Sequence, residues 1–188
     1  MTSSEASQKS DQMQPQTTQL LEGCHYCLGQ CQQLLERVAV EDYRAQSGSQ
    51  SSVGAHLRHV LERFQSLLNG LPEARIDYDN RRRDPALEQN PDSAAFALTS
   101  IRRRLKELQR SDGLAGAVAT DGLLVSESVH PGQQAVTVSS SIERELMSLV
   151  SHSVHHLALI AMLLRPLGYT LDEQFGKAPS TLIHQARA

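Results

Sequence analysis

The sequence predicts an all-α fold: an antiparallel four-helix bundle with a short extended or hairpin excursion between its third and fourth helices. In four segments, apolar residues recur at steps of three and four, the period of a helix that buries one face. These segments cover roughly residues 18–46, 52–71, 93–110 and 141–167. The chain of 188 residues is long enough to form one domain with a sizeable core.

The bundle is expected to span residues 18–170. Residues 1–17 are rich in Ser, Gln and Thr and contain almost nothing to bury, so we expect a disordered tail. Residues 171–188 follow helix-breaking proline and glycine residues. We expect them to form a C-terminal tail that docks partly, around Phe175 and Gly176.

The sequence argues against a membrane protein and against a general nucleic-acid binder. The longest apolar run, Leu157–Leu164, is far shorter than the ~20 residues that span a bilayer, and the front of the chain lacks a secretory signal. The net charge is −3, although two arginine runs, Arg81–Arg83 and Arg102–Arg104, are present. We expect a cytoplasmic protein, with the second arginine run on the solvated face of a helix.

Three cysteines, Cys24, Cys27 and Cys31, lie on the apolar stripe of the first predicted helix. A CxxC pair can be a redox or metal site, with His25 beside it. Cysteine is also a small apolar core residue. Because no second cysteine pair exists, we favour the core interpretation.

Two connections in the predicted bundle need their own interpretation. Residues 72–93 mix Asp and Arg around Tyr78, which indicates either an internally paired loop or the lining of a pocket for an acidic ligand. Residues 113–140 carry two short β-prone runs on either side of the turn-forming His130-Pro131-Gly132. This pattern predicts the hairpin excursion.

The last predicted helix carries His152, His155 and His156. Its apolar residues form one stripe: Ile142, Leu146, Leu149, Val150, Leu157, Ile160 and Leu164. At about 100° per residue, His152 and His156 lie on the shoulder of that stripe, whereas His155 faces water. Two histidines at i and i+4 can close on one metal ion, or they can simply be hydrogen-bonded within a helix interface.

A third metal ligand is available on the second predicted helix, which carries His56 and His59. His56 lies nearer the centre of the apolar stripe, and His59 lies on its flank. An ion bound at the edge of a bundle is reached from the flank. The spacing alone does not choose between the two.

The helix-two pattern SVGAHLRHVLERF and the helix-four pattern SHSVHHLALI resemble those of the DinB/YfiT-like superfamily of four-helix bundles. The resemblance extends from about Leu20 to Leu167, and the segments YDNRRRD, SIEREL and FGKAPST look like those of an uncharacterised bacterial branch. It implies that His59, His152 and His156 bind a divalent metal. In relatives the position of His56 is commonly aliphatic, so the resemblance implies that His56 supports the site or is simply packed.

Three neutral imidazoles leave an open coordination position, the mark of a catalytic site. Zinc is the first choice of metal, and nickel or iron also accepts nitrogen ligands. The open position can hold a water, whose pKa the metal lowers, or a thiol, which it deprotonates. Because several relatives transfer small thiols, the resemblance favours a thiol transferase over a hydrolase, with a small-molecule thiol or an electrophile as substrate.

Three charged residues are further candidates for the predicted metal site. Glu145 lies on the histidine side of the last helix as a supporting group or proton acceptor, with a surface or arginine-paired role as the alternative. Arg81 and Arg83 can bind the carboxylate of a thiol or substrate. The alternative functions are a non-catalytic metal-binding stress or sensor protein and a structural or nucleic-acid-associated helical protein. Bundles of this kind often pair through an exposed helix face, so a homodimer is a further expectation.

Overall fold

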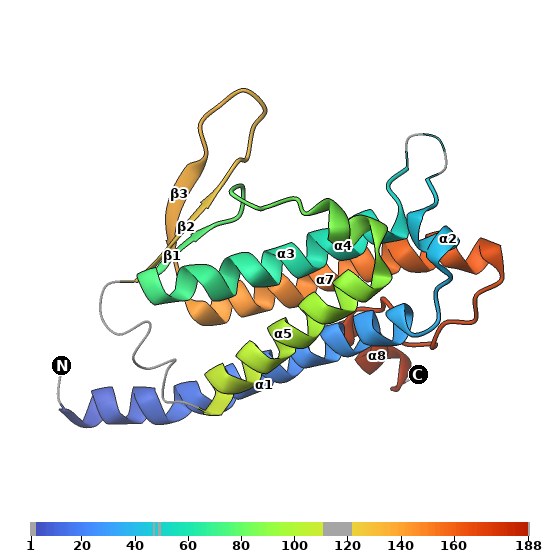
Figure 1. The fold of residues 1–188 in the computed structure, drawn as a ribbon. Helices are drawn as coiled ribbons and strands as arrows, with labels where there is room; N and C mark the ends of the chain where they lie inside the picture. The colour runs from blue at the N-terminus through green and yellow to red at the C-terminus, as the bar shows by residue number, and fades with distance from the viewer. Residues whose placement is uncertain (1–2, 47, 49, 111–121, 188) are drawn as a thin grey trace.

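Four long helices form the body of the molecule (Figure 1). The computed structural model describes residues 3–46, 48, 50–110 and 122–187. Helix α1 (Ser3–Leu35) packs against both α5 (Pro91–Arg110) and α7 (Ile142–Leu164), and α3 (Val53–Gly70) packs against the same two helices. The four apolar stripes therefore meet around one core, as the helical periodicity predicts.

The predicted antiparallel arrangement is wrong for half of the neighbouring pairs. Cys24 lies beside Leu146 and Cys27 lies beside Val150, so α1 and α7 run in the same direction. Helices α3 and α5 are likewise parallel, whereas α3 and α7 run in opposite directions (Figure 1). The connection from α3 to α5 causes this difference, because it returns the chain to the end of the bundle where α3 began.

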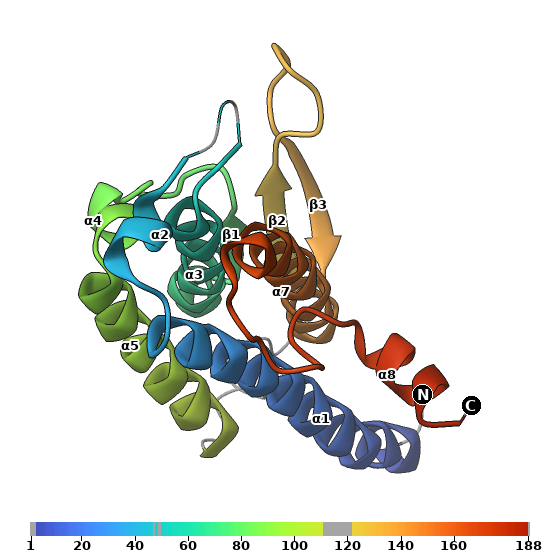
Figure 2. The same ribbon diagram turned by 90° about the vertical axis from the view of Figure 1, so that its right-hand side faces the viewer.

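The all-α fold class is also wrong, because the protein contains a three-stranded mixed sheet. Strand β1 (Arg75–Asp77) pairs in parallel with β2 (Leu123–Glu127), and β2 pairs antiparallel with β3 (Val136–Ser140). The hairpin β2–β3 is the predicted excursion, and Figure 2 shows it rising from the bundle beside α7. Part of the predicted excursion, residues 113–121, lies outside the described residues.

The unpredicted strand β1 lies in the segment that we expected to be irregular. Ile76 and Tyr78 are buried and alternate with the exposed Arg75 and Asp77. This is the period of a strand with one buried face. Its partner β2 lies far ahead in the sequence, so the pairing had no local signal. The same segment also contains a short helix, α4 (Pro85–Gln89).

The first predicted helix differs from the structure at both ends. It begins at Ser3, within the segment that we expected to be a disordered tail. It ends at Leu35 rather than Gln46, and a separate helix α2 (Val40–Arg44) follows. The break orients the buried Tyr43, whose hydroxyl donates a hydrogen bond of 2.5 Å to the carbonyl of Leu87.

Among the described residues, the remaining elements are the 3-10 turns η1 (Leu71–Glu73) and η2 (Arg165–Leu167) and the short helix α8 (Pro179–Gln185). Before α8, Phe175 is buried and Gly176 adopts a positive φ of 71°. A Cβ at Gly176 would lie 2.6 Å from the backbone nitrogen of Ala158 on α7. The C-terminal segment therefore crosses α7 where only a glycine fits.

The cysteines belong to the core. Cys24, Cys27 and Cys31 are fully buried, and the Cys24 and Cys27 thiols lie against backbone carbonyls of α7. Burial raises the pKa of Cys24 to about 12, that of Cys27 to about 11, and that of Cys31 further still. Protonated, buried thiols are poor nucleophiles and poor metal ligands, so the core interpretation of this stripe holds.

Helix α7 is the most apolar of the four. By length and by a mean hydropathy of 1.5, the stretch Ile142–Leu167 could cross a membrane. A helix at the centre of a globular domain meets the same criterion, and α7 packs against both α1 and α3. Cytoplasmic localisation stays a prediction.

Candidate metal centre

Helices α3 and α7 present their histidines to each other. Each helix begins with a serine cap: the Ser52 hydroxyl accepts from the Ala55 amide at 3.0 Å, and the Ser141 hydroxyl accepts from the Arg144 amide at 3.2 Å. Each then buries one apolar stripe against the bundle. The histidines on the shoulders of the two stripes therefore face one another across the helix interface.

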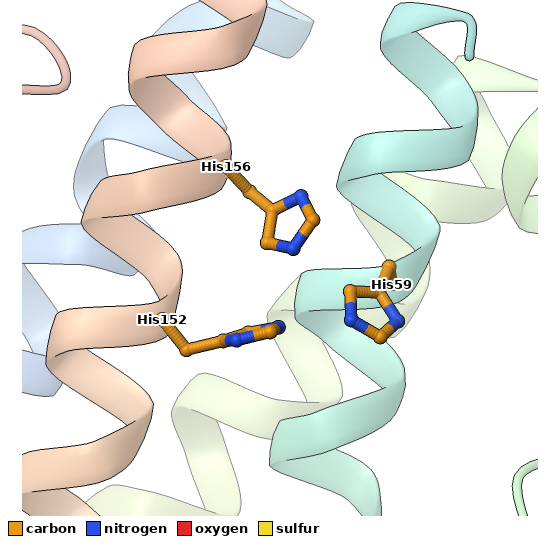
Figure 3. A group of neighbouring side chains, drawn as sticks. All are labelled: His59, His152 and His156. Carbon is orange, nitrogen blue, oxygen red and sulfur yellow. The ribbon is translucent and has the colours of Figure 1, made fainter. Parts of the chain in front are cut away.

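His59, His152 and His156 form one cluster (Figure 3). Their ring centroids are 4.8 Å apart for His59 and His152, 4.7 Å for His59 and His156, and 4.5 Å for His152 and His156. One nitrogen from each ring lies within 4.8 Å of the other two. The structure therefore brings together the three residues that the resemblance implies, and it selects His59 over His56 for this cluster.

The hydrogen bonds identify the nitrogens that face the centre. The Nδ1 atom of His156 lies 3.0 Å from the Nδ1 atom of His56, and the Nδ1 atom of His59 is hydrogen-bonded to Arg81. The Nε2 atom of His152 is buried and has no hydrogen-bond partner among the described residues. The three Nε2 atoms are therefore the ones that face the centre of the cluster (Figure 3).

These residues fit a divalent metal. Zinc binds imidazole nitrogens at about 2.0–2.1 Å, which places the nitrogens of a tetrahedral site about 3.4 Å apart. The observed separations of up to 4.8 Å are close enough for small ring rotations to complete such a site. The buried Nε2 atom of His152 is a second indication, because a buried polar atom without a partner is costly unless a ligand satisfies it.

The environment keeps all three imidazoles neutral. Burial, the largest cause, and neighbouring positive charge together lower the pKa of His59 to about 3, that of His152 to about 4 and that of His156 to about 3. Among the charges, Arg81 acts on His59 and Arg63 acts on His152. A neutral imidazole offers the lone pair that a metal needs.

His56 contacts the ring of His156 at Nδ1, the nitrogen that faces away from the centre of the cluster. If His156 binds an ion through Nε2, its Nδ1 carries the proton and donates it to the Nδ1 atom of His56 at 3.0 Å. Such a partner fixes the ring orientation and the tautomer of a ligating histidine. The sequence signal was the HxxH spacing on α3, which left open whether His56 is a ligand or a supporting residue.

Two arginines border the cluster. Arg81 reaches it from the loop between β1 and α4 and hydrogen-bonds to His59. The buried Arg63 of α3 pairs with Glu127 at 2.5 Å and stacks 3.9 Å from the centre of the Tyr78 ring. Sequence analysis missed Arg63, because on α3 it follows the apolar stripe and resembles an ordinary surface charge.

The structure does not bring Arg83 or Glu145 to the histidines. Arg83 is exposed, and among the described residues it has no hydrogen bond or ion pair with the cluster. The carboxylate of Glu145 is buried and accepts hydrogen bonds from Tyr78 at 2.8 Å and Ser140 at 2.6 Å. Glu145 thus ties α7 to the sheet, and its catalytic role stays a prediction.

The loop that follows β1 is internally paired. Asp77 accepts from the amides of Asp79 and Asn80, and Asp79 accepts from the Ser128 amide at 2.6 Å. At its far end, the Asp84 amide donates to the buried carboxylate of Glu62 at 2.7 Å. These contacts confirm the paired loop, and the same loop holds Arg81 at the cluster; a pocket for an acidic ligand stays a prediction.

A groove of about 670 Å³ lies elsewhere, between α1 and α5, where Gln32, Arg102 and Lys106 line it. None of the clustered histidines lines this groove. In the second arginine run, Arg103 is exposed and pairs with Glu107, as expected for a solvated helix face. Arg104 is instead partly buried and donates to the carbonyl of Leu68 at 2.7 Å, so it joins α5 to the end of α3.

No protein-family model, curated protein or solved structure matches the chain.

Proposed function

We propose that the protein is a divalent-metal-dependent enzyme that transfers or conjugates a small thiol, or hydrolyses a substrate, at a site formed by His59, His152 and His156. The observation that carries the proposal is the convergence of three neutral imidazoles from two helices, one of them with a buried nitrogen that has no hydrogen-bond partner in the described part of the chain. Zinc is the preferred metal, and nickel and iron are also compatible with nitrogen ligands.

The ligand set favours catalysis over a purely structural role. Structural zinc sites are closed by four protein ligands, whereas three protein ligands leave a position for water or substrate. There a divalent ion lowers the pKa of a bound water or deprotonates a bound thiol. The resemblance to thiol-transferring bundles favours a thiol as the nucleophile and an electrophilic small molecule as its partner.

The surrounding residues have distinct roles in this proposal. His56 orients His156 by accepting its Nδ1 proton. Arg63 and Arg81 add positive charge beside the cluster, which favours an anionic group on the substrate. Arg83 is a candidate for contact with a larger substrate, because it extends from the same loop as Arg81.

The proposal is tested by metal analysis of the purified protein together with turnover assays. We expect about one equivalent of metal in the wild type, and its loss in His59→Ala and His152→Ala. His155→Ala is the matched control, because His155 lies on the same helix and is exposed. Bound metal that survives both substitutions would refute the ligand set.

Turnover is then measured with small thiols and an electrophile, such as an epoxide or a chlorinated compound. Conjugation of the thiol to the electrophile that requires the bound metal supports the proposed enzymatic function. A metal-loaded protein that turns over none of a broad panel points instead to the alternative of a non-catalytic sensor or stress protein. Sedimentation of the same sample checks the expected homodimer.

A further inference from the structure

The hydrogen bond between Arg81 and His59 has a chemical consequence for metal binding. A neutral imidazole has a single nitrogen lone pair, and a guanidinium can only donate hydrogen bonds. Because Arg81 donates to Nδ1 of His59, the lone pair lies on Nδ1 and the ring proton lies on Nε2. In this state the nitrogen that faces the cluster carries a proton.

An ion needs that same lone pair. If the ion binds Nε2, the proton moves to Nδ1, which then needs an acceptor that Arg81 cannot provide. If the ion binds Nδ1, it displaces Arg81 directly. Either way the Arg81–His59 hydrogen bond and coordination by neutral His59 exclude each other. The His56–His156 contact has no such conflict, because His56 can accept.

Once displaced, the Arg81 guanidinium lacks an obvious acceptor. Its Nε atom and that of Arg63 are already buried without hydrogen-bond partners among the described residues. The two carboxylates whose charges act on Arg81 already have partners of their own: Glu62 accepts from the Asp84 amide, and Glu127 pairs with Arg63. A carboxylate on an incoming ligand would satisfy Arg81 and would offset the added charge of the ion.

The loop permits this exchange without refolding. Its first end is fixed by the hydrogen bond from the Tyr78 amide to the Ser126 carbonyl at 3.0 Å, and its far end by the contact between Asp84 and Glu62. Between these anchors Arg81 is only partly buried. A rotation of its side chain is sufficient to release His59.

We propose that Arg81 opposes metal binding by occupying the lone pair of His59, and that a carboxylate-bearing ligand relieves this opposition by taking up the Arg81 guanidinium. The metal and the anionic ligand then bind cooperatively, each strengthening the other by the same factor. This inference rests on the proposed metal site and narrows its substrate to small thiols that carry a carboxylate.

The first test is metal affinity without any thiol, measured by titrating Co²⁺ or Zn²⁺ against a chelator. Loss of a hydrogen bond from a charged donor should make Arg81→Gln bind metal roughly ten- to a hundredfold more tightly than the wild type. Arg82→Gln is the matched control, because it removes an exposed charge from the same loop. It should change affinity by less than about threefold.

The second test compares 3-mercaptopropionate with 2-mercaptoethanol on the Co²⁺-loaded protein, followed by thiolate–cobalt absorption. Wild type and Arg82→Gln should prefer the carboxylate-bearing thiol by about tenfold more than Arg81→Gln does. Chelation of the metal by the carboxylate itself would persist in Arg81→Gln. The difference in thiol preference between the wild type and Arg81→Gln therefore measures the contribution of the Arg81 guanidinium.

A third readout is the ¹⁵N spectrum of the histidine rings in the metal-free wild type, where His59 should carry its proton on Nε2. The inference is overturned if that proton lies on Nδ1, or if Arg81→Gln leaves either the metal affinity or the thiol preference unchanged. In those cases metal binding that depends on the histidines would leave the proposed function standing. A wild type that binds no metal would refute both.

Discussion

Replacement of His152 by alanine tests the metal centre through stability. Zinc at 100 times its Kd stabilises a folded protein by about 2.7 kcal/mol. For a chain of 188 residues, each kcal/mol raises Tm by about 2–4 °C, so the wild type should gain about 5–11 °C on addition of zinc. Differential scanning calorimetry with and without zinc measures this gain.

The His152→Ala variant should lose nearly all of this gain in Tm. Structural zinc sites bind with about 10–16 kcal/mol from four ligands, or about 2.5–4 kcal/mol per ligand, which corresponds to roughly 10²–10³ in Kd. At the same zinc concentration His152→Ala should therefore gain no more than about 2 °C. Its metal-free Tm should change little, because the substitution removes a buried nitrogen that none of the described residues hydrogen-bonds.

His155→Ala serves as the control on the same helix, because this histidine is exposed. It should keep the full gain. The reasoning is refuted if His152→Ala gains as much Tm from zinc as the wild type does, since the ion would then bind somewhere else.

Four further predictions rest on the contacts and the pKa values. His56→Phe removes the acceptor of His156 and should weaken zinc binding by about 10–100-fold, as chelator competition would show. Because the folded-state pKa values of the three histidines lie at about 3–4, zinc affinity should stay flat from pH 7 to about pH 5; a loss that begins near pH 6.5 would contradict these values. In the metal-free protein the same lowered pKa values mean that the unfolded state takes up protons first, so stability should decline as the pH falls from 6.5 towards 4. Gly176→Ala should destabilise by more than about 2 kcal/mol in urea titrations, whereas Gly168→Ala, which also has a positive φ but open space, should cost only about 1–2 kcal/mol.

Helical periodicity was sufficient to place the long helices and the shoulders on which the histidines lie. His152 and His156 are one turn apart, so any helix that buries this stripe presents both rings to its neighbour. The third ring was not fixed by spacing, because His56 and His59 flank the same stripe. The different positions of the two histidines became clear only from the packing of α3 against α7. It places His59 in the cluster and His56 at the Nδ1 atom of His156.

The parts that sequence analysis missed depend on contacts between distant segments. Strand β1 contains only three residues, and two of them are charged. Its partner β2 begins 48 positions after Arg75, and Arg75 pairs with Leu124. Nothing local to Glu145 indicated that its two carboxylate oxygens accept hydrogen bonds from Tyr78, which follows β1, and from Ser140 of β3. Likewise, nothing local to Arg81 indicates that it reaches His59.

Anomalous diffraction from a zinc-loaded crystal, recorded on both sides of the zinc edge, would locate the ion itself. We expect one strong peak about 2.0–2.1 Å from Nε2 of His59, His152 and His156. A peak at the cysteine stripe, a peak bound by only one of these histidines, or no peak at the cluster would contradict this expectation.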